Sequence, residues 1–129
     1  MPSRLCPAWH VKAYLLLSKV RQLMSNAFRR YEILLPQRYN DGSPVPDEIF
    51  GDALLELRQR FGSVSSETQI IRGYWQHEGQ LYRDELTRVF VDVPDTPENS
   101  QFFLEFKERL KTQFRQIDIW MTTHPIDKV

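Results

Sequence analysis

The chain of 129 residues has one cysteine, Cys6, and only five glycines. One cysteine cannot form a disulfide within the chain, and it provides no thiolate cluster for zinc. With so few glycines, a phosphate cradle of backbone N–H groups is not expected, and no nucleotide-binding, hydrolase or metalloprotease motif occurs. The three histidines are too scattered for a ligand set. We therefore expect no metal and no cofactor.

Long hydrophobic runs are also absent. The apolar run at residues 13–17 is far shorter than the roughly 20 residues that span a bilayer, and shorter than the core of a signal peptide. We expect no membrane partner. A reducing, cytoplasmic location fits a chain with a single cysteine.

An excess of positive charge is missing as well. The chain has 17 basic and 17 acidic residues, and four of the basic ones precede residue 25, where there is no acid. The rest of the chain is therefore mildly acidic, which gives no basis for neutralising phosphates. Residues 88–91 only faintly echo the RNA-recognition motif and lack its glycines, so we expect no nucleic-acid partner.

Residues 1–29 differ in composition from the remainder and are predicted to form an N-terminal extension. Three hypotheses stay open: a disordered terminus, an amphipathic helix over residues 10–24, and a basic organelle-targeting segment. Met24 is an alternative start of the natural protein.

Residues 30–129 have the composition of one small globular domain. The apolar run at residues 31–36 predicts a first strand, and a dense set of turn-forming residues at 40–47 follows it. Apolar positions then recur at helical spacing up to Gly62, which predicts a helix over residues 47–61. They are Ile49, Phe50, Ala53, Leu54, Leu57 and Phe61.

The second half repeats this alternation of strand and helix. Residues 65–77 and 80–93 alternate around Gly79 and predict a hairpin whose tip projects beyond the core. Thr96 and Pro97 predict a helix start, and Phe103, Phe106, Leu110 and Phe114 its buried stripe. Residues 117–122 alternate as a last strand. The order βαββαβ predicts a ferredoxin-like α+β fold, a four-stranded antiparallel sheet with two helices on one face.

Such a fold leaves the other sheet face uncovered. Its candidate residues are Trp75, Tyr82, Phe90 and Trp120, mixed with Arg72, Arg83, Arg88 and Glu85. Because exposed patches with several aromatic residues usually mark an interface, we expect a two-fold homodimer through this face.

The polar residues of the hairpin are the richest candidate for a binding site. We single out Arg72, Trp75, His77, Arg83 and Glu85, where arginine would anchor an anion and His77 or Glu85 would move a proton. The competing interpretation is a charged hairpin tip with surface ion pairs that contribute little. His124 and Cys6 have no identifiable catalytic partner.

Residues 31–36, the turn 40–42 with Pro44 and Pro46, and residues 81–91 together resemble a group of small uncharacterised bacterial proteins classed as domains of unknown function. The resemblance covers about residues 30–125. It implies a bacterial origin and a compact α+β fold, and it carries over no activity and no site residues.

The sequence therefore favours a non-catalytic binding or interaction module that dimerises through its open sheet face. A small-molecule ligand is compatible with this function. The alternative is a cofactor-independent enzyme that resembles the dimeric α+β barrels and acts on a small organic substrate.

Overall fold

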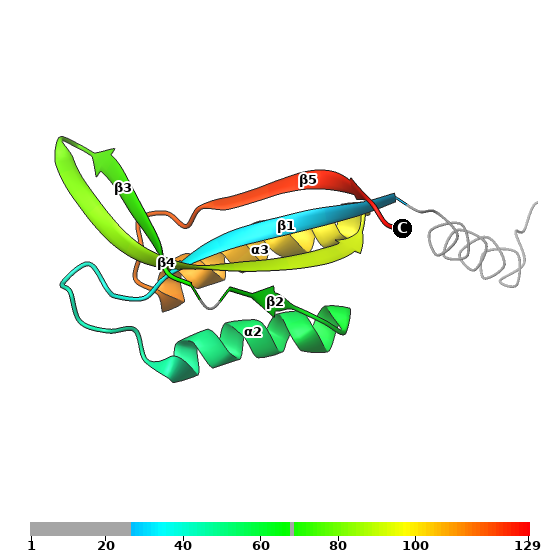
Figure 1. Ribbon diagram of the computed structural model, residues 1–129, viewed down its shortest axis with the longest axis horizontal. Coiled ribbons are helices and arrows are strands. Elements are labelled where there is room, and N and C mark those ends of the chain that lie inside the picture. Colours follow the sequence, from blue (N-terminus) through cyan, green and yellow to red (C-terminus); the bar gives the residue numbers. More distant parts are fainter. Residues whose placement is uncertain (1–26, 68) are drawn as a thin grey trace, which may run out of the picture.

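The computed structural model describes residues 27–67 and 69–129. Strands and helices alternate as predicted, and the chain has the ferredoxin-like α+β fold, with two helices and an antiparallel sheet (Figure 1). The elements are β1 (Ala27–Pro36), α2 (Asp47–Phe61), β2 (Ser65–Ser66), β3 (Ile71–His77), β4 (Gln80–Pro94), α3 (Pro97–Gln113) and β5 (Met121–Asp127).

The sheet has the strand order β2-β4-β1-β5, and β3 lies off this path and pairs with the outer part of β4. All pairs are antiparallel, and β1 lies between β4 and β5, where Tyr31 is opposite both Val91 and Thr123. In Figure 1, β3 and the outer part of β4 extend away from the helices as a two-stranded arm.

The core lies between the sheet and the two helices. Alternate residues of the central strands, such as Ile33 and Val91, point toward α2 and α3 and are buried. Tyr31 stacks on Phe103 of α3 with ring centroids 3.8 Å apart. All four residues of the predicted stripe are buried, three on α3 and Phe114 at its C-cap. Among the described residues, no polar or charged residue is buried.

The helix signals in the sequence are confirmed. The predicted bounds of α2 match the structure, and Gly62 follows it with φ 85° and donates its N–H to Arg58 O at 2.8 Å. Positive φ favours glycine here because a Cβ would be strained. At α3, the Thr96 hydroxyl accepts a hydrogen bond from Asn99 N at 3.2 Å, which satisfies one of the free N–H groups of the first turn.

The first strand begins earlier than predicted. β1 starts at Ala27, not near residue 30, because Arg29 and Phe28 continue the pairing with Val93 and Pro94. The predicted extension and the hypotheses for it otherwise fall on residues 1–26, which lie outside the described residues. The domain boundary stays a prediction.

Two strand predictions were wrong in detail. Residues 65–77 are not one strand, because Ser66 is opposite Val89 whereas Ile71 is opposite Leu86. This side of the pair therefore holds two extra residues, which interrupt it as a bulge does. The last strand is Met121–Asp127, not residues 117–122, since pairing with β1 begins only at Met121.

The register also corrects the predicted composition of the open sheet face. Trp75, Tyr82 and Phe90 are on the open side, as predicted. Placing Arg72, Arg83 and Glu85 there was wrong. Along β4, Arg83 and Glu85 point to the same side as Val89, which faces the helices, and Arg72 is on this side because it is paired with Glu85. A one-residue shift in phase moves every side chain to the other face, and the hairpin pattern did not specify the phase.

None of the helices in the part of the chain that the structure describes is long and apolar enough to span a bilayer.

Candidate functional site

A narrow loop at residues 37–45 follows β1 and reaches toward the arm. Gln37 N donates to Glu85 O at 2.7 Å, and Val45 N donates back to Gln37 O at 2.9 Å. At the loop tip, the Asp41 carboxylate accepts from Ser43 N at 2.8 Å and also from the Ser43 hydroxyl. These hydrogen bonds hold the pKa of Asp41 below its usual value. The loop is therefore fixed by its own turn chemistry and by contacts of Gln37 and Arg38 to β4.

The arm, defined as residues 71–86, is a two-stranded ribbon closed by Glu78 and Gly79. Both residues have positive φ, 49° and 77°, as a tight hairpin turn requires. From Ile71 opposite Leu86 to His77 opposite Gln80 the strands pair without interruption. Between Leu86 and the turn, no third described strand pairs with the arm. The side chains on one face of the arm therefore point to the loop side, and those on the other face point to the open side.

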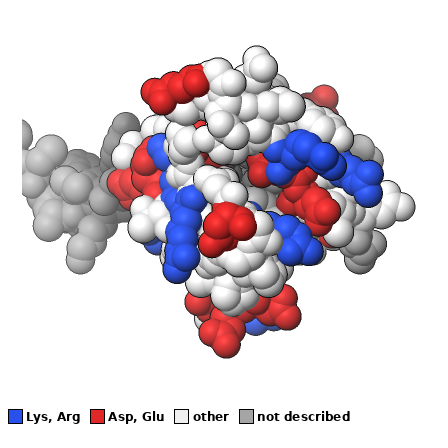
Figure 2. Space-filling model, turned by 90° about the vertical axis from the view of Figure 1, so that its left-hand side faces the viewer, with Lys and Arg blue, Asp and Glu red and all other residues white. Residues whose placement is uncertain are grey.

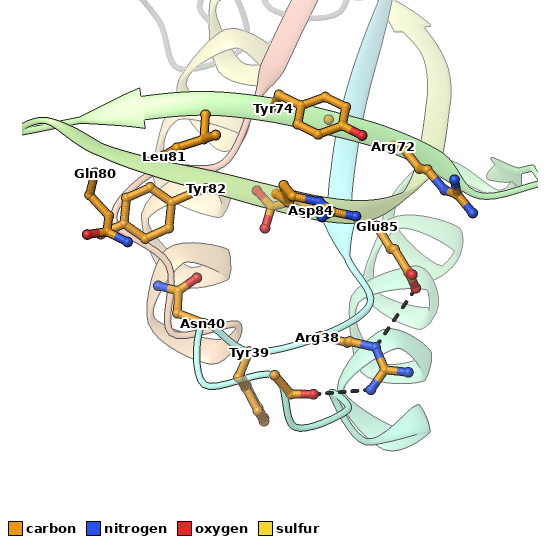
Figure 3. A pocket seen from close by; sticks show the side chains of 13 residues that line it. Arg38, Tyr39, Asn40, Arg72, Tyr74, Gln80, Leu81, Tyr82, Asp84 and Glu85 are labelled. Carbon is orange, nitrogen blue, oxygen red and sulfur yellow. Dashed lines mark hydrogen bonds and ion pairs between the residues drawn. The ribbon is translucent and has the colours of Figure 1, made fainter.

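The first cavity, here called the arginine pocket, lies between the loop and the arm (Figure 3). Its volume is about 420 Å³, which suits one small molecule. Its lining combines cationic, phenolic and amide side chains with two carboxylates: Arg38, Tyr39, Asn40, Gly42, Arg72, Gly73, Tyr74, Gln80, Leu81, Tyr82, Arg83, Asp84 and Glu85.

The three arginines of this pocket are not equally neutralised. Arg38 lies 3.9 Å from Glu85 Oε2 through its Nε, and its Nη1 donates to Gly42 O at 3.1 Å. Figure 3 shows both contacts on the loop side of the cavity. Arg72 and Arg83 form no ion pair with any residue that the structure describes, and Arg83 lies 5.9 Å from the ring centre of Tyr74. The pocket therefore holds two guanidinium groups whose charge is not offset.

The second cavity, here called the apolar hollow, opens on the sheet face that the helices leave uncovered. It has a volume of about 360 Å³, and no basic residue is among its lining residues. They are Leu34, Pro36, Gly73, Tyr74, Trp75, Asp84, Leu86, Gln116, Asp118 and Trp120. Trp120 stands at its rim with 66% of its surface exposed.

Trp75 is held in place at this hollow. Its Nε1 donates to Asp84 Oδ2 at 2.6 Å, and its ring stacks on Tyr82 with centroids 4.4 Å apart. His77 lies farther out, 6.3 Å from Trp75 between ring centroids, and its only described charged neighbour is Glu78 at 3.8 Å. His77 lines neither cavity.

The rest of the open face carries paired charges around one aromatic ring. Arg30 forms two hydrogen bonds with Asp92 at 2.7 and 2.9 Å. Arg88 donates to Glu67 at 2.8 Å and lies 3.4 Å from Glu32. Both guanidinium groups also lie near the Phe90 ring, at 4.5 and 5.4 Å from its centre. The cations of this face are thus neutralised within the chain.

The structure divides the five residues that the sequence singles out. Arg72, Arg83 and Glu85 line the arginine pocket, Trp75 lines the apolar hollow, and His77 belongs to neither. Sequence reasoning missed the loop residues of the pocket, Arg38, Tyr39 and Asn40. Their only signal was a dense turn directly after the first strand, and no local pattern showed that this turn reaches β4.

No group of three or more side chains suited to a metal ion occurs among residues 27–67 and 69–129. The shifted carboxyl groups, Asp41 and Asp92, each have a described structural partner and line neither cavity.

Comparison with solved structures shows the fold. The chain is similar to a phage SAM lyase in complex with S-methyl-5′-thioadenosine, with a TM-score of 0.58 and 15% identity over 81% of this chain and 92% of the lyase. It is also similar to the divalent cation tolerance protein CutA from Thermus thermophilus, with a TM-score of 0.54 and 15% identity over 79% and 86%. CutA from Synechococcus elongatus gives 0.51 and 9% over 82% and 86%.

No protein-family model matches the chain. No curated protein sequence matches it significantly either. The class that the comparisons define is therefore the ferredoxin-like α+β fold shared with these two kinds of protein.

Proposed function

We propose that the protein is a non-catalytic binding module that works as a homodimer, with the open sheet face as the contact between two copies. The observation that carries this proposal is that an exposed tryptophan and an apolar cavity lie side by side on this face. Trp120 is largely exposed at the rim of the apolar hollow, which is lined by Leu34, Leu86 and Trp75.

A two-fold axis near this rim would let each copy place its Trp120 in the hollow of the other, since an isologous contact uses the same patch twice. Burying an indole removes a large apolar area from water. Within one chain, Arg30 is paired with Asp92 and Arg88 with Glu67. Two open faces could therefore come together without burying an unpaired cation, which supports the same contact.

The test is sedimentation velocity of the full chain at micromolar concentration. We expect a dimer whose dissociation constant rises at least about tenfold in Trp120→Ala, as for a central aromatic anchor. Leu104→Ala is the matched control, because Leu104 is similarly exposed (62%) but lies on α3. A strictly monomeric wild type, or equal dissociation constants for Trp120→Ala and wild type, would contradict the proposal.

The alternative is a cofactor-independent enzyme on a small organic substrate. It is favoured by one observation, a cavity with Arg83 and Glu85 in its lining on a fold that a phage SAM lyase shares. Against it, His77 lies outside the cavity and Glu85 already faces Arg38. Incubation with SAM followed by chromatography for S-methyl-5′-thioadenosine decides this, since release of that product would establish a lyase and replace the non-catalytic proposal.

A further inference from the structure

We propose that the arginine pocket binds a small organic anion that carries a planar ring next to its negative charge. The site lies between the loop at residues 37–45 and the arm (Figure 3), and it shares Gly73, Tyr74 and Asp84 with the lining of the apolar hollow but not Trp120, the side chain that anchors the proposed dimer. The inference therefore goes beyond the proposed function and does not depend on it.

The charge of the ligand follows from the unpaired arginines. Arg72 is directly opposite Glu85, and Arg83 is directly opposite Tyr74, so the two guanidinium groups extend from neighbouring positions on one face of the ribbon. Glu85 is the carboxylate residue opposite Arg72, but Arg38 approaches its carboxylate from the loop. The other carboxylate in the lining, Asp84, accepts the hydrogen bond of Trp75. A carboxylate or phosphate group would give Arg72 and Arg83 the bidentate oxygen partner that planar guanidinium groups favour.

The planar ring follows from an exposed phenolic side chain. Tyr74 is 63% exposed, and its ring lies beside the Arg83 charge. Tyr39 of the loop also lines the cavity, but its ring packs against the core with the Arg115 guanidinium 4.5 Å from its centre, and Figure 3 shows it pointing away from the arm. Aromatic faces next to a cation bind a ring that carries negative charge at its edge, by stacking and by charge at once. Asn40 and Gln80 add amide donors and acceptors at the same opening (Figure 3).

The size and the surrounding charge favour a small molecule over a polyanion. The cavity of about 420 Å³ holds one small ligand. On the side of the molecule that shows the arm and the loop, acidic and basic side chains are mixed and form no broad basic field (Figure 2). A nucleic acid would need such a field, because its binding depends on neutralising successive phosphates.

Isothermal titration calorimetry of the full chain tests the inference with four probes. Benzoate and adenosine monophosphate each carry a ring and a charge, whereas adenosine has only the ring and inorganic phosphate only the charge. We expect benzoate or adenosine monophosphate to bind with a dissociation constant below about 1 mM, at least about tenfold tighter than both partial probes. Which of the two binds distinguishes a carboxylate ligand from a phosphate ligand.

Variants then assign the binding to the pocket. Arg72→Gln and Arg83→Gln should each weaken binding about tenfold or more, because each removes a charged hydrogen-bond donor. Arg83→Lys should lie between wild type and Arg83→Gln, since lysine keeps the charge but not the planar fork. Arg58→Gln is the matched control, an exposed arginine on α2 that lines neither cavity.

Three results would overturn the inference: no binding of either charged ring probe below about 1 mM, binding of the tighter charged ring probe no stronger than that of adenosine or inorganic phosphate, or unchanged affinity in both glutamine variants. All the substituted side chains are exposed, so the variants should fold, which circular dichroism checks. Trp120→Ala should bind the probe as wild type does, which separates this test from that of the dimer.

Discussion

At the scale of single residues, the pair Arg30 and Asp92 couples stability to pH. The hydrogen bonds from Arg30 hold the pKa of Asp92 below its usual value. Because the folded pKa is the lower one, the stabilisation is present above the unfolded value, about 3.9, and is lost as the pH falls through the folded value.

We therefore expect Asp92→Asn to lower the free energy of unfolding at pH 7 by roughly 0.5 to 1 kcal/mol, as for a half-exposed pair. Urea denaturation across an acid titration should show this difference shrinking toward zero as the pH falls. Asp52→Asn, at an exposed position on α2, is the control and should show no such convergence. A difference that persists at the acid end would argue against the pair as its cause.

Neighbouring residues on α3 provide a second residue-scale prediction. Phe103 is buried against Tyr31, whereas Leu104 beside it is exposed. Phe103→Ala should lower the free energy of unfolding by about 3 to 5 kcal/mol, through lost burial and the cavity left behind. Leu104→Ala should change it by less than about 0.5 kcal/mol in the same denaturation experiment. Comparable losses in both variants would mean that the face of α3 is misassigned.

At the scale of elements, alanine substitutions of a glycine within α2 and of the glycine that follows it should change the stability of the protein in opposite directions. Gly51 lies within the helix with open space where a Cβ would stand, so Gly51→Ala should stabilise the protein by up to about 1 kcal/mol. Gly62 has positive φ, and Gly62→Ala should cost about 1 kcal/mol. Thermal unfolding of the two variants against wild type measures the sign directly, and the same sign in both would contradict the helix end at Phe61.

The arm should open locally more often than the central part of the sheet. A two-stranded ribbon without a third strand is marginally stable by itself. Amide hydrogen exchange should therefore be faster in β3 than in β1, which is paired on both sides. Equal protection of the two strands in the monomer would mean that the arm is stabilised by contacts other than those described.

At the scale of the whole molecule, the sequence predicted most of the fold and only part of the candidate site. Helix α2 and the cap at Thr96 were predicted because their signals lie within a few residues of one another. The bounds of β5 were wrong, because strand ends depend on a partner elsewhere in the chain. Arg72 and Arg83 both line the arginine pocket, whereas the sequence analysis placed them on the open sheet face.

The sequence by itself determined the alternation of strands and helices, both ends of α2, the start of α3 and its buried stripe, since these follow from local hydrogen bonding and from periodic burial. Only the tertiary structure decided the phase of the arm and the meeting of the turn after β1 with the outer part of β4. The hydrogen bond from Gln37 N to Glu85 O joins segments that are distant in the chain. Such a contact depends on how the sheet pairs and packs, and the arginine pocket exists because of it.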